Sequence, residues 1–542
     1  MQTQLLDPAR NPAAVETAAR LLQAGEVVGL PTETVYGLGA NALNRAAVRK
    51  IFQAKGRPQD NPLIVHIAEF SQIKPLVSQI PAAAKRLAEA FWPGPLTMIL
   101  PKSDAIPDEV SAGLPSVGIR MPAHPVAQAI LRVAGLPVAA PSANRSGKPS
   151  TTTARHVLED MDGSIAAVVD GGPCRVGVES TVISLVTNPP RLLRPGGISL
   201  EQLRAVLGEV AVDKALYESI ADTESVSAPG MKYRHYAPKA PVTVLSGRPD
   251  LTARYIRSHA DEETGVLCFD EFRNRFPKGA VLSFGSFADP AEQARQVFDA
   301  LRAFDHLPVT RIYAQCPEDS GVGLAVSNRL KKAAGFQVIP LPELAVAGLT
   351  GGSGCGKTLV SRLLEPKGIP TVNADTVYHT LLDTDPDLRF ALRRTFGSGI
   401  FDQAGHLQRK ALGSIVFSDP EKLHILSELT TPLIREASFA AFNRLAKQGY
   451  SLCLYDAPTL FETGFDRFCT YTVSVLAPKE LRIARIQQRD KVSYAYAAAR
   501  VQAQPADAFY KTRSQFLLEN GESQDKLRRH VMEFYKTIMA QE

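Results

Sequence analysis

Residues 351–358 have the types and spacing of a phosphate-binding loop. They fit G-x-x-x-x-G-K-[ST], follow an apolar stretch at 344–349 and precede a helix-like stretch with Leu359 and Leu363 on one face. In such a loop the glycines let backbone N–H groups turn toward phosphate oxygens, the lysine reaches the β- and γ-phosphates, and the next hydroxyl can ligate Mg²⁺. A glycine turn with a solvated lysine does not explain the flanking strand and helix. The sequence therefore predicts an ATP and Mg²⁺ site at Gly351, Gly352, Ser353, Gly354, Cys355, Gly356, Lys357 and Thr358.

Charged residues downstream of this loop could complete a phosphoryl-transfer site. A short strand at 370–372 runs into Asn-Ala-Asp, so we expect Asp375 to project from the strand's carboxyl end as a general base. The apolar strand 452–455 delivers Asp456, which could hold Mg²⁺ or a water. Taken alone, Asp456 could equally cap a turn, and arginines along a helix usually form a solvated face. A later helix carries three arginines spaced to cover the transferring phosphoryl group as a lid, namely Arg482, Arg485 and Arg489.

The N-terminal part of the chain carries a different set of polar side chains, placed where strands and helices are expected to end. Singly, each has an ordinary structural explanation: Thr-x-Thr can be strand surface, Lys-Gly-Arg-Pro a solvated turn and Ser-Ala-Asn a helix cap. It is their order along the chain that indicates a site. In chain order they are Thr34, Lys55, Arg57, Asn61, His66, Arg120, Ser142, Asn144, Ser180, Thr181 and Arg194.

The elements that must position these residues alternate between helix and strand. Apolar spacing predicts helices at 13–24, 46–54 and 82–91 and strands at 26–30, 63–67, 96–100, 138–140, 168–169 and 181–185. A smaller α/β segment follows, with strands at 242–245, 265–269 and 311–314 and helices at 291–303 and 325–334. No hydrophobic period survives between 213 and 241.

These patterns predict an α/β multidomain chain. The expected parts are an α/β domain at 1–210, a linker at 211–240, a small Rossmann-like accessory domain at 241–337 and a P-loop domain with a parallel sheet at 343–542.

Composition excludes several classes of protein. The 542 residues are 45% hydrophobic and 21% charged, as in globular domains and unlike disordered, coiled-coil or collagen chains. A net charge of +6 is too mild to indicate strong direct binding of nucleic acid. Six cysteines without a C-x-x-C pair favour a reducing cytoplasm over a disulfide framework or a zinc knuckle. With no secretory leader and no long apolar run, we expect a cytoplasmic protein without a membrane segment.

Ordered blocks follow one another from about residue 343 to the end: AVAGLTGGSGCGKT, TVNAD, GHLQRKALGSIVF, LYDAPTLFETG, RIQQRD, RVQAQ and LLENGE. Together they resemble dephospho-CoA kinase. The resemblance implies transfer of the γ-phosphate of ATP to the ribose 3′-hydroxyl of dephospho-CoA, the last step of coenzyme A synthesis. It makes Lys357 and Asp375 catalytic, adds Arg489 to the ATP site, and places Arg409 and Glu462 in blocks that face substrate or lid. The usual Asp-Ala-Asp is here Asn373-Ala374-Asp375, and the frequent His-Pro is Thr431-Pro432.

A second series of blocks runs through the first part of the chain: PTETVYGLG, KGRPxxNPL, FWPGPLT, VGIRMP, PSANRSG, ESTV and LRPG. In this order they resemble the YrdC-like domain. The later PGMKYRHYAP and the accessory domain resemble the long form of threonylcarbamoyl-AMP synthase, so the resemblance covers roughly residues 10–337. It implies condensation of L-threonine, bicarbonate and ATP into threonylcarbamoyl-AMP and pyrophosphate. The product would pass to a partner complex that modifies tRNA.

This second resemblance also assigns residues. Threonine carbamate must attack the α-phosphorus of ATP while pyrophosphate leaves, so cations and fixed donors have to oppose the gathered negative charge. The catalytic pair would be Lys55 and Arg57, and the segment carrying Tyr236 would fold over the site as a lid that excludes water. The ATP-binding set would be Lys55, Arg57, Asn61, Ser142, Asn144, Arg194 and Tyr236. Threonine would contact Thr34, His66, Arg120, Ser180 and Thr181, with the Arg120 guanidinium pairing the carboxylate.

We therefore expect a bifunctional enzyme with ATP as substrate at two independent sites. Two alternatives stay open at this point. The first half could be an RNA-binding YrdC-like module beside a kinase that is the sole enzyme, although its intact threonine and adenylate residues argue for a synthase. The kinase could instead phosphorylate another small molecule, such as a nucleoside or a shikimate-like acceptor.

Overall fold

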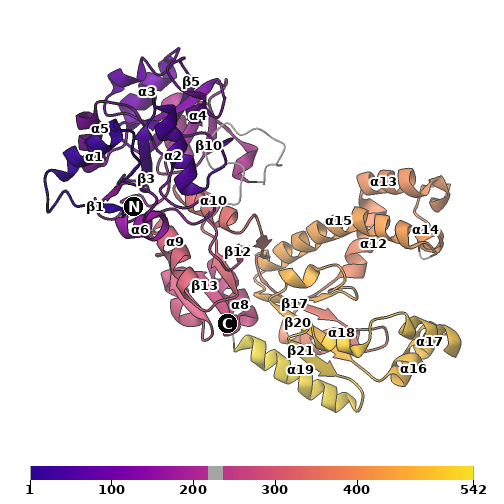
Figure 1. Ribbon diagram of the computed structural model, residues 1–542. Coiled ribbons are helices and arrows are strands. Elements are labelled where there is room, and N and C mark those ends of the chain that lie inside the picture. Colours follow the sequence, from indigo (N-terminus) through magenta and orange to yellow (C-terminus); the bar gives the residue numbers. More distant parts are fainter. Residues whose placement is uncertain (1, 218–235, 404, 417, 541–542) are drawn as a thin grey trace. The chain divides into compact units, whose positions relative to one another are not determined.

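Figure 1 shows the computed structural model, which describes residues 2–217, 236–403, 405–416 and 418–540. The chain forms two compact units, one of Met1–Ser246 with Ala260–Val338 and one of Gly247–His259 with Ile339–Glu542. Both units combine sheets with helices, so the α/β multidomain fold class is confirmed. No helix among the described residues is long and apolar enough to cross a membrane.

The first unit contains a mixed sheet of eleven strands in the order β1-β8-β2-β3-β7-β4-β6-β5-β9-β10-β11. The last strand, β11, lies beyond the expected domain end at residue 210. Strands β4 and β6 are parallel and place His66 opposite Arg120 at their ends. The strands are β1 (Gln4–Leu6), β2 (Val28–Leu30), β3 (Gly37–Asn41), β4 (Ile64–His66), β5 (Leu96–Pro101), β6 (Ser116–Arg120), β7 (Val138–Ala139), β8 (Ala167–Val169), β9 (Thr181–Ser184), β10 (Arg191–Arg194) and β11 (Ala211–Val212).

Amphipathic helices pack against this sheet. Helix α2 shows how local sequence sets a functional residue: the Asn44 side chain caps its start by accepting from the N–H groups of Ala46 and Ala47, and the left-handed Gly56 (φ 60°) ends it directly after Lys55. The helices are α1 (Ala14–Gln23), α2 (Arg45–Lys55), α3 (Ala82–Phe91), α4 (Asp108–Ser111), α5 (Pro125–Ala134), α6 (Ala154–Met161) and α7 (Leu200–Leu207).

The accessory domain of the first unit has a parallel sheet with the strand order β14-β13-β15-β12. Its core is continuous with the first domain, because Val35 and Val178 pack in the same apolar cluster as Phe298 and Leu330. The elements are β12 (Val242–Ser246), β13 (Thr264–Cys268), β14 (Ala280–Ser283), β15 (Arg311–Gln315), α9 (Pro290–Ala303) and α10 (Gly323–Ala333).

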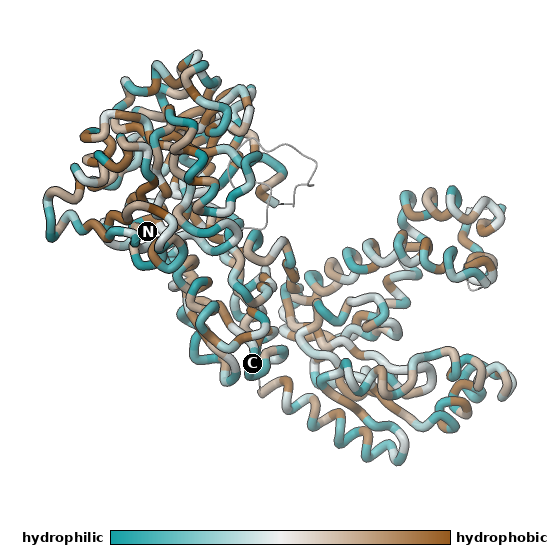
Figure 2. The backbone as a smooth tube through the Cα atoms, viewed as in Figure 1, coloured by the Kyte–Doolittle hydropathy of each residue, from teal (hydrophilic) through white to brown (hydrophobic). Residues whose placement is uncertain are grey.

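The second unit is built on a parallel sheet with the order β18-β19-β17-β20-β21, and its longer segment begins at Ile339, within β16 (Val338–Pro340). Strands β17, β19 and β20 are buried along their whole length, as expected when helices cover both faces of a parallel sheet. Figure 2 shows helix α19 alternating between hydrophobic and hydrophilic residues, and its buried side chains are Leu527, Val531, Phe534 and Ile538. The strands are β17 (Ala345–Thr350), β18 (Thr371–Asn373), β19 (Leu452–Asp456), β20 (Tyr471–Leu476) and β21 (Phe516–Glu519).

Among the helices described from α11 to α19, four (α11, α12, α16 and α19) each come next after a strand of the sheet, and the others follow a preceding helix. Helix α15 carries Pro432 in its interior. The helices are α11 (Lys357–Leu364), α12 (Ala374–Thr384), α13 (Pro386–Phe396), α14 (Arg409–Val416), α15 (Pro420–Lys447), α16 (Lys479–Asp490), α17 (Tyr494–Gln502), α18 (Asp507–Lys511) and α19 (Gln524–Met539).

Helix α8 (Pro249–His259) belongs to the second unit, although it lies within the range expected for the accessory domain. Residues 251–256 are all buried, and Leu251 joins the core formed by β17, β20 and α19. The Tyr255 hydroxyl donates to the carbonyl of Arg467 at 2.9 Å. The boundary at residue 241 therefore does not separate all of the accessory sequence from the P-loop unit.

Candidate active sites

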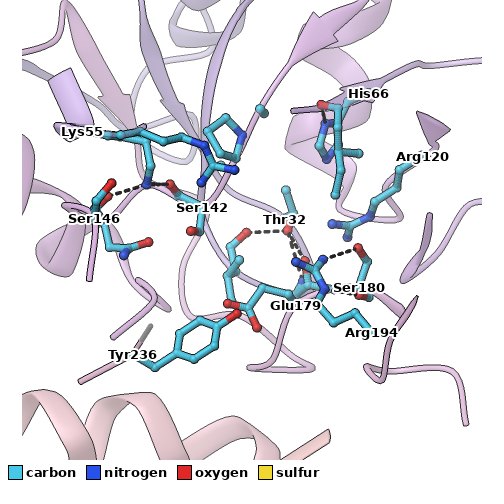
Figure 3. Close-up of a pocket in the computed structure, with 18 residues that line it drawn as sticks. Thr32, Lys55, His66, Arg120, Ser142, Ser146, Glu179, Ser180, Arg194 and Tyr236 are labelled. Carbon is cyan, nitrogen blue, oxygen red and sulfur yellow. Dashed lines mark hydrogen bonds between the residues drawn. The ribbon is translucent and has the colours of Figure 1, made fainter. Parts of the chain in front are cut away.

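A cavity that is partly open to solvent lies at the strand ends of the first sheet (Figure 3). It gathers polar residues that come from distant parts of the sequence. Figure 3 shows Lys55, Ser142 and Ser146 on one side and His66 and Arg120 on the other. The predicted residues that line it are Thr34, Lys55, Arg57, His66, Arg120, Ser142, Asn144, Ser180, Arg194 and Tyr236.

Lys55 is held at the cavity wall by two backbone carbonyls. Its ammonium donates to the carbonyl oxygens of Ser142 and Asn144. Burial lowers the pKa of Lys55 well below its usual value, and the neighbouring Arg57 lowers it further. An anion in the cavity would supply the opposite charge that this ammonium needs, so the position suits a phosphate.

Arg57 is fixed by the loop that follows it. Its guanidinium donates to the carbonyls of Pro62 at 3.0 Å and Asn61 at 3.3 Å. Burial lowers the pKa of Arg57 to about 10, so it remains a cation at neutral pH. Asn61 contacts Arg57 through its backbone and is not among the lining residues, while its side-chain Oδ1 is buried with no partner in the described part of the chain.

The opposite side of the cavity is organised by a buried ion pair. Arg120 donates to Glu33 Oε1 at 2.6 Å, and the other oxygen of Glu33 accepts from the Ala123 N–H. Burial by itself would raise the pKa of Glu33, but the Arg120 guanidinium outweighs it and holds the carboxyl ionised. Burial, reinforced by Arg120, lowers the pKa of His66 to about 3, so this imidazole is neutral. The side chains therefore offer a fixed guanidinium and an uncharged ring.

Ser180 connects this side to the centre of the cavity. Its hydroxyl lies 2.8 Å from the Thr97 hydroxyl, and Arg194 donates to its carbonyl and hydroxyl at 3.1 and 3.2 Å. Thr181, predicted to bind the same ligand, is not among the lining residues. Its hydroxyl donates to the Ile198 carbonyl at 2.6 Å, because neighbouring strand residues point to opposite faces.

Sequence reasoning missed several residues of this cavity. Thr32, Ser146 and Glu179 line it, and Glu33 orients Arg120. Glu33 and Glu179 stand inside the PTET and ESTV blocks, which was the available signal. Their partners could not be read from the sequence, because the contacts join distant segments. The expected lid falls mainly on residues 218–235, outside the described residues.

The phosphate-binding loop has the expected place between β17 and α11. Gly351 (φ +135°) and Gly356 (φ +105°) adopt backbone conformations that side chains disfavour, and a Cβ at Gly356 would lie 2.2 Å from Asn520 Nδ2. Lys357 donates to the Gly351 carbonyl at 2.8 Å, so its ammonium lies across the loop. Asn520, directly after β21, donates to the Cys355 carbonyl at 2.7 Å and so holds the backbone of the loop in place.

Two carboxylates follow the neighbouring strands. Asp456 ends β19, where Asn373 donates to its Oδ2 at 3.3 Å and its Oδ1 has no partner among the described residues. Burial raises the pKa of Asp456, Lys357 opposes this, and Asp375 adds to it. Asp375 does not project from a strand end as expected: it lies exposed in the first turn of α12, because the Asn373 side chain caps the helix by accepting from the Thr376 N–H.

The three arginines of α16 are placed differently from the expected lid. Arg482 donates to the Ser353 carbonyl at 3.0 Å and Arg485 to the Gly354 carbonyl at 3.2 Å, so both hold the loop itself. Arg489 pairs with Asp490 at 2.7 Å. Helical spacing alone could not show that the loop's carbonyls, rather than a ligand, accept these bonds.

Two further residues were expected to face substrate or lid. Arg409 pairs with Asp383 at 2.7 Å, and Glu462 is exposed.

A second cavity, also open to solvent, lies at the carboxyl ends of β20 and β21. It is lined by Leu476, Pro478, Glu519 and Gly521, next to Asn520, which supports the phosphate-binding loop. An apolar and polar lining at this edge of a parallel sheet is where open α/β folds bind nucleotides.

Comparisons with known proteins identify the families to which the parts of the chain are similar. A family model described as telomere recombination matches residues 20–196, one described as threonylcarbamoyl-AMP synthase, C-terminal domain, matches 198–335, and one described as dephospho-CoA kinase matches 345–525. A threonylcarbamoyl-AMP synthase of Bacillus subtilis is 52% identical over 332 residues, which are 61% of this chain and 95% of the relative. The chain belongs to the threonylcarbamoyl-AMP synthase family, and its last part to the dephospho-CoA kinase family.

The kinase assignment rests on its own relative. A dephospho-CoA kinase of Anaeromyxobacter dehalogenans is 36% identical over 185 residues, covering 34% of this chain and 87% of the relative. For the synthase, the crystal structure of Pyrococcus abyssi Sua5 complexed with L-threonine aligns at a TM-score of 0.58 and 45% identity, covering 63% of this chain and all of that one. The chain is thus bifunctional, with a synthase and a kinase that both use ATP.

Proposed function

We propose that the synthase cavity forms threonylcarbamoyl-AMP and pyrophosphate from L-threonine, bicarbonate and ATP. The observation that carries this proposal is the division of one cavity into two sides. Lys55 stands on one side with Ser142, and Arg120 with the neutral His66 stands on the other, while Arg57 lies near enough to Lys55 to lower its pKa. Polyphosphate suits the first side and an amino acid suits the second. A related structure is described as a complex with L-threonine, which supports the second assignment.

In this proposal each side chain has a distinct task. Arg120, oriented by Glu33, pairs the threonine carboxylate, and the uncharged His66 shares a hydrogen bond with the ligand without adding charge. The carbamate oxygen forms a bond to the α-phosphorus as the bond from that phosphorus to pyrophosphate breaks. Lys55, Arg57 and Arg194 stabilise the negative charge that gathers at this step. Ser142, Asn144 and Tyr236 bind ATP, and Thr34 and Ser180 contact threonine. Asn61 and Thr181 are not among the described lining residues, so in this proposal Asn61 positions Arg57 through its carbonyl and Thr181 holds the segment of Ile198, and neither contacts a ligand directly.

For the kinase, we propose that Asp375 takes the proton of the ribose 3′-hydroxyl of dephospho-CoA while the residues of 351–358 hold the ATP phosphates. The exposed Asp375 carboxylate lies close enough to Asp456 to raise its pKa, and Lys357 of the phosphate-binding loop lies close enough to lower it. Lys357 would stabilise the transferring phosphoryl group, and Arg489 would release Asp490 to reach ATP.

The residues present fit a Mg²⁺ ion at this kinase site. Asp456 presents a buried oxygen without a partner, and Thr358 presents an exposed hydroxyl at the start of α11. Within the described ranges no three His, Cys, Asp or Glu residues form a metal cluster, which agrees with an ion that takes most ligands from phosphates and water. Mg²⁺ bound there neutralises phosphate charge. The residues that would hold it are Thr358 and Asp456.

We further propose that threonylcarbamoyl-AMP passes to a separate tRNA-modifying transferase complex.

We also propose revised domain boundaries. The chain divides into a synthase domain through β11, a connecting segment, an accessory domain from β12 to α10 without α8, and a kinase domain that includes α8.

A paired assay on the full-length protein tests both activities. Pyrophosphate release should require threonine and bicarbonate together, and labelled ATP should phosphorylate dephospho-CoA in preference to nucleoside and shikimate-like acceptors. If the folded protein releases no pyrophosphate under these conditions, the synthase proposal is contradicted. A clear preference for another acceptor would sink the kinase proposal.

A further inference from the structure

The accessory domain reaches the synthase cavity through one arginine of α10. Arg329 is completely buried, and its guanidinium donates to Glu179 Oε2 at 2.6 Å and to the Pro195 carbonyl at 2.9 Å. Glu179 lines the cavity, and Pro195 directly follows the lining residue Arg194. Arg329 therefore contacts two segments of the synthase domain that carry site residues, from a domain that contributes no lining residue itself.

Glu179 is an unexpected residue in a polyphosphate site. Among the described residues that line the cavity it is the single carboxylate, and it faces the same space as Lys55, Arg57 and Arg194. Burial by itself would raise the pKa of Glu179, but the guanidiniums of Arg329 and Arg194 bring it to about 2, so the group is charged. A charged carboxylate repels ATP unless its charge is balanced by a cation outside the ligand's own set.

Tyr236 lies beside the same arginine. Its ring lies 5.6 Å from the Arg329 guanidinium and 5.1 Å from the ring of Phe298 in α9. The backbone of Tyr236 is in the left-handed region (φ +66°), which is strained for a side chain and persists only when surrounding contacts hold it. The preceding residue of α10, Asn328, donates to the Leu216 carbonyl at 2.9 Å. Neighbouring residues of α10 thus bind the described chain on both sides of 218–235.

We infer that Arg329 is a positioning residue of the synthase site, which balances the Glu179 carboxylate inside the ATP-binding cavity and holds Tyr236 against it. The accessory domain is then required for ATP binding, rather than being an appended module. This inference rests on the proposed function, because it takes the cavity to be the ATP site.

The test compares Arg329→Gln, Arg329→Lys, Glu179→Gln and the double variant Glu179→Gln/Arg329→Gln. Arg329→Gln removes the guanidinium bonded to Glu179 and leaves this carboxylate with the Ser150 hydroxyl and the charges of Arg194 and Lys332, so KM for ATP in pyrophosphate release should rise about tenfold or more. Removing Glu179 as well removes the repulsion, so KM in the double variant should return to within about threefold of the wild type. Arg329→Lys keeps the charge but cannot reproduce both the bond to the Pro195 carbonyl and the contact with the Tyr236 ring, so its KM for ATP should lie between those of the wild type and Arg329→Gln.

Lys331 on the same helix provides a matched control, because it pairs with Asp319 at 2.8 Å outside the cavity. Lys331→Gln should leave kcat and KM for ATP in pyrophosphate release unchanged. Trp92, the single tryptophan of the chain, lies in the first unit, so its fluorescence checks that each variant is folded. An unchanged KM in Arg329→Gln would overturn the inference. If Arg329→Gln does not fold, the double variant decides. A tenfold or larger rise of KM for ATP in the folded double variant would overturn the inference, because packing by Arg329 rather than its charge would then explain the effect.

Equilibrium binding separates this inference from the proposed reaction. ATP binding is measured in a Lys357→Ala background, which weakens the kinase site, and the binding that remains in Lys55→Ala/Lys357→Ala is subtracted so that the difference reports the synthase cavity. Loss of affinity in Arg329→Gln and its recovery in the double variant would support the inference even if the wild type released no pyrophosphate, an outcome that contradicts only the proposed reaction. Unaltered affinity in Arg329→Gln would contradict the inference alone.

Discussion

The guanidinium of Arg254 in α8 lies 5.4 Å from the ring centroid of Tyr471 in β20 and donates a 2.9 Å hydrogen bond to its hydroxyl. The same side chain donates to the Ile538 carbonyl at 3.0 Å, in the last turn of α19. Carbonyls at a helix C-terminus lack partners within the helix and carry partial negative charge, so a buried cation is well matched there. Arg254 therefore joins three elements of the second unit.

Arg254→Ala should lower the free energy of unfolding of the second unit by about 3 kcal/mol, because two buried bonds from a charged donor are lost. The temperature at which kinase activity disappears should fall, while the Trp92 fluorescence transition of the first unit should not move. Arg248, just before α8, makes only an exposed pair with Asp250, so Arg248→Ala should change stability by at most about 1 kcal/mol. Equal effects of the two substitutions would contradict the role of α8.

Two lysines should separate the two activities. Lys55→Ala should abolish pyrophosphate release and spare phosphorylation of dephospho-CoA, whereas Lys357→Ala should do the reverse, because each ammonium serves a different phosphate site. Both activities are measured on each purified variant. Loss of both activities in either folded variant would show that the sites are coupled.

Arg120→Lys should raise KM for threonine about tenfold or more, because an ammonium keeps the charge but cannot form the two parallel bonds of a guanidinium to a carboxylate. KM for ATP should change by no more than about twofold, since Arg120 lies on the opposite side of the cavity from Lys55. Arg132→Lys, on the exposed face of α5, is the matched control. A rise in KM for ATP alone would show that the two sides have been assigned the wrong way round.

Local sequence predicted the elements well and their mutual contacts poorly. The expected helix at 82–91 and the strand at 96–100 are found as Ala82–Phe91 and Leu96–Pro101, because apolar spacing and buried runs are local signals. The pairs of Glu33 with Arg120 and of Glu179 with Arg329 join residues 87 and 150 positions apart. No pattern within one segment encodes such partners, since they depend on how distant segments of the chain pack together.

The same distinction explains where the predicted site needed adjustment. Ser180 and Thr181 were equivalent in the sequence, but the alternation of strand side chains turns only Ser180 toward the cavity. Arg482 looked like a lid residue, yet its partner is the carbonyl of Ser353 in the phosphate-binding loop. Side-chain direction within an element is decided by register and packing, which spacing alone does not fix.

Asp375→Asn should lower kcat of the kinase about 100-fold or more, because an amide cannot take the proton of the acceptor hydroxyl. KM for ATP should stay close to the wild-type value, since the phosphate-binding loop is untouched. Asp387, exposed in the first turn of the next helix, provides a matched control, and Asp387→Asn should leave kcat unchanged. A drop of less than about threefold in Asp375→Asn would assign the base to another group, with Asp456 the next candidate.

The first unit should lose stability in acid through Glu179. The pKa of this carboxyl is about 2 in the folded protein, against 4.5 for an unperturbed glutamate, so the unfolded chain binds its proton first as pH falls. Stability from this group is complete above about pH 5 and is lost as pH falls toward about 2, a change of about 3 kcal/mol. Urea unfolding followed by Trp92 fluorescence measures it at each pH.

Other carboxyls with lowered pKa, among them Glu33 and Asp160, titrate in the same acid range, so the comparison that isolates Glu179 is with the variant Glu179→Gln/Arg329→Gln. That variant lacks both members of the pair, so its free energy of unfolding should fall less steeply below about pH 5 than that of the wild type, and the two curves should converge. Parallel curves over the whole acid range would mean that Glu179 is not ionised in the folded protein. The charge that Arg329 is inferred to balance would then be absent. This result would contradict both the predicted loss of stability through Glu179 and the inferred role of Arg329.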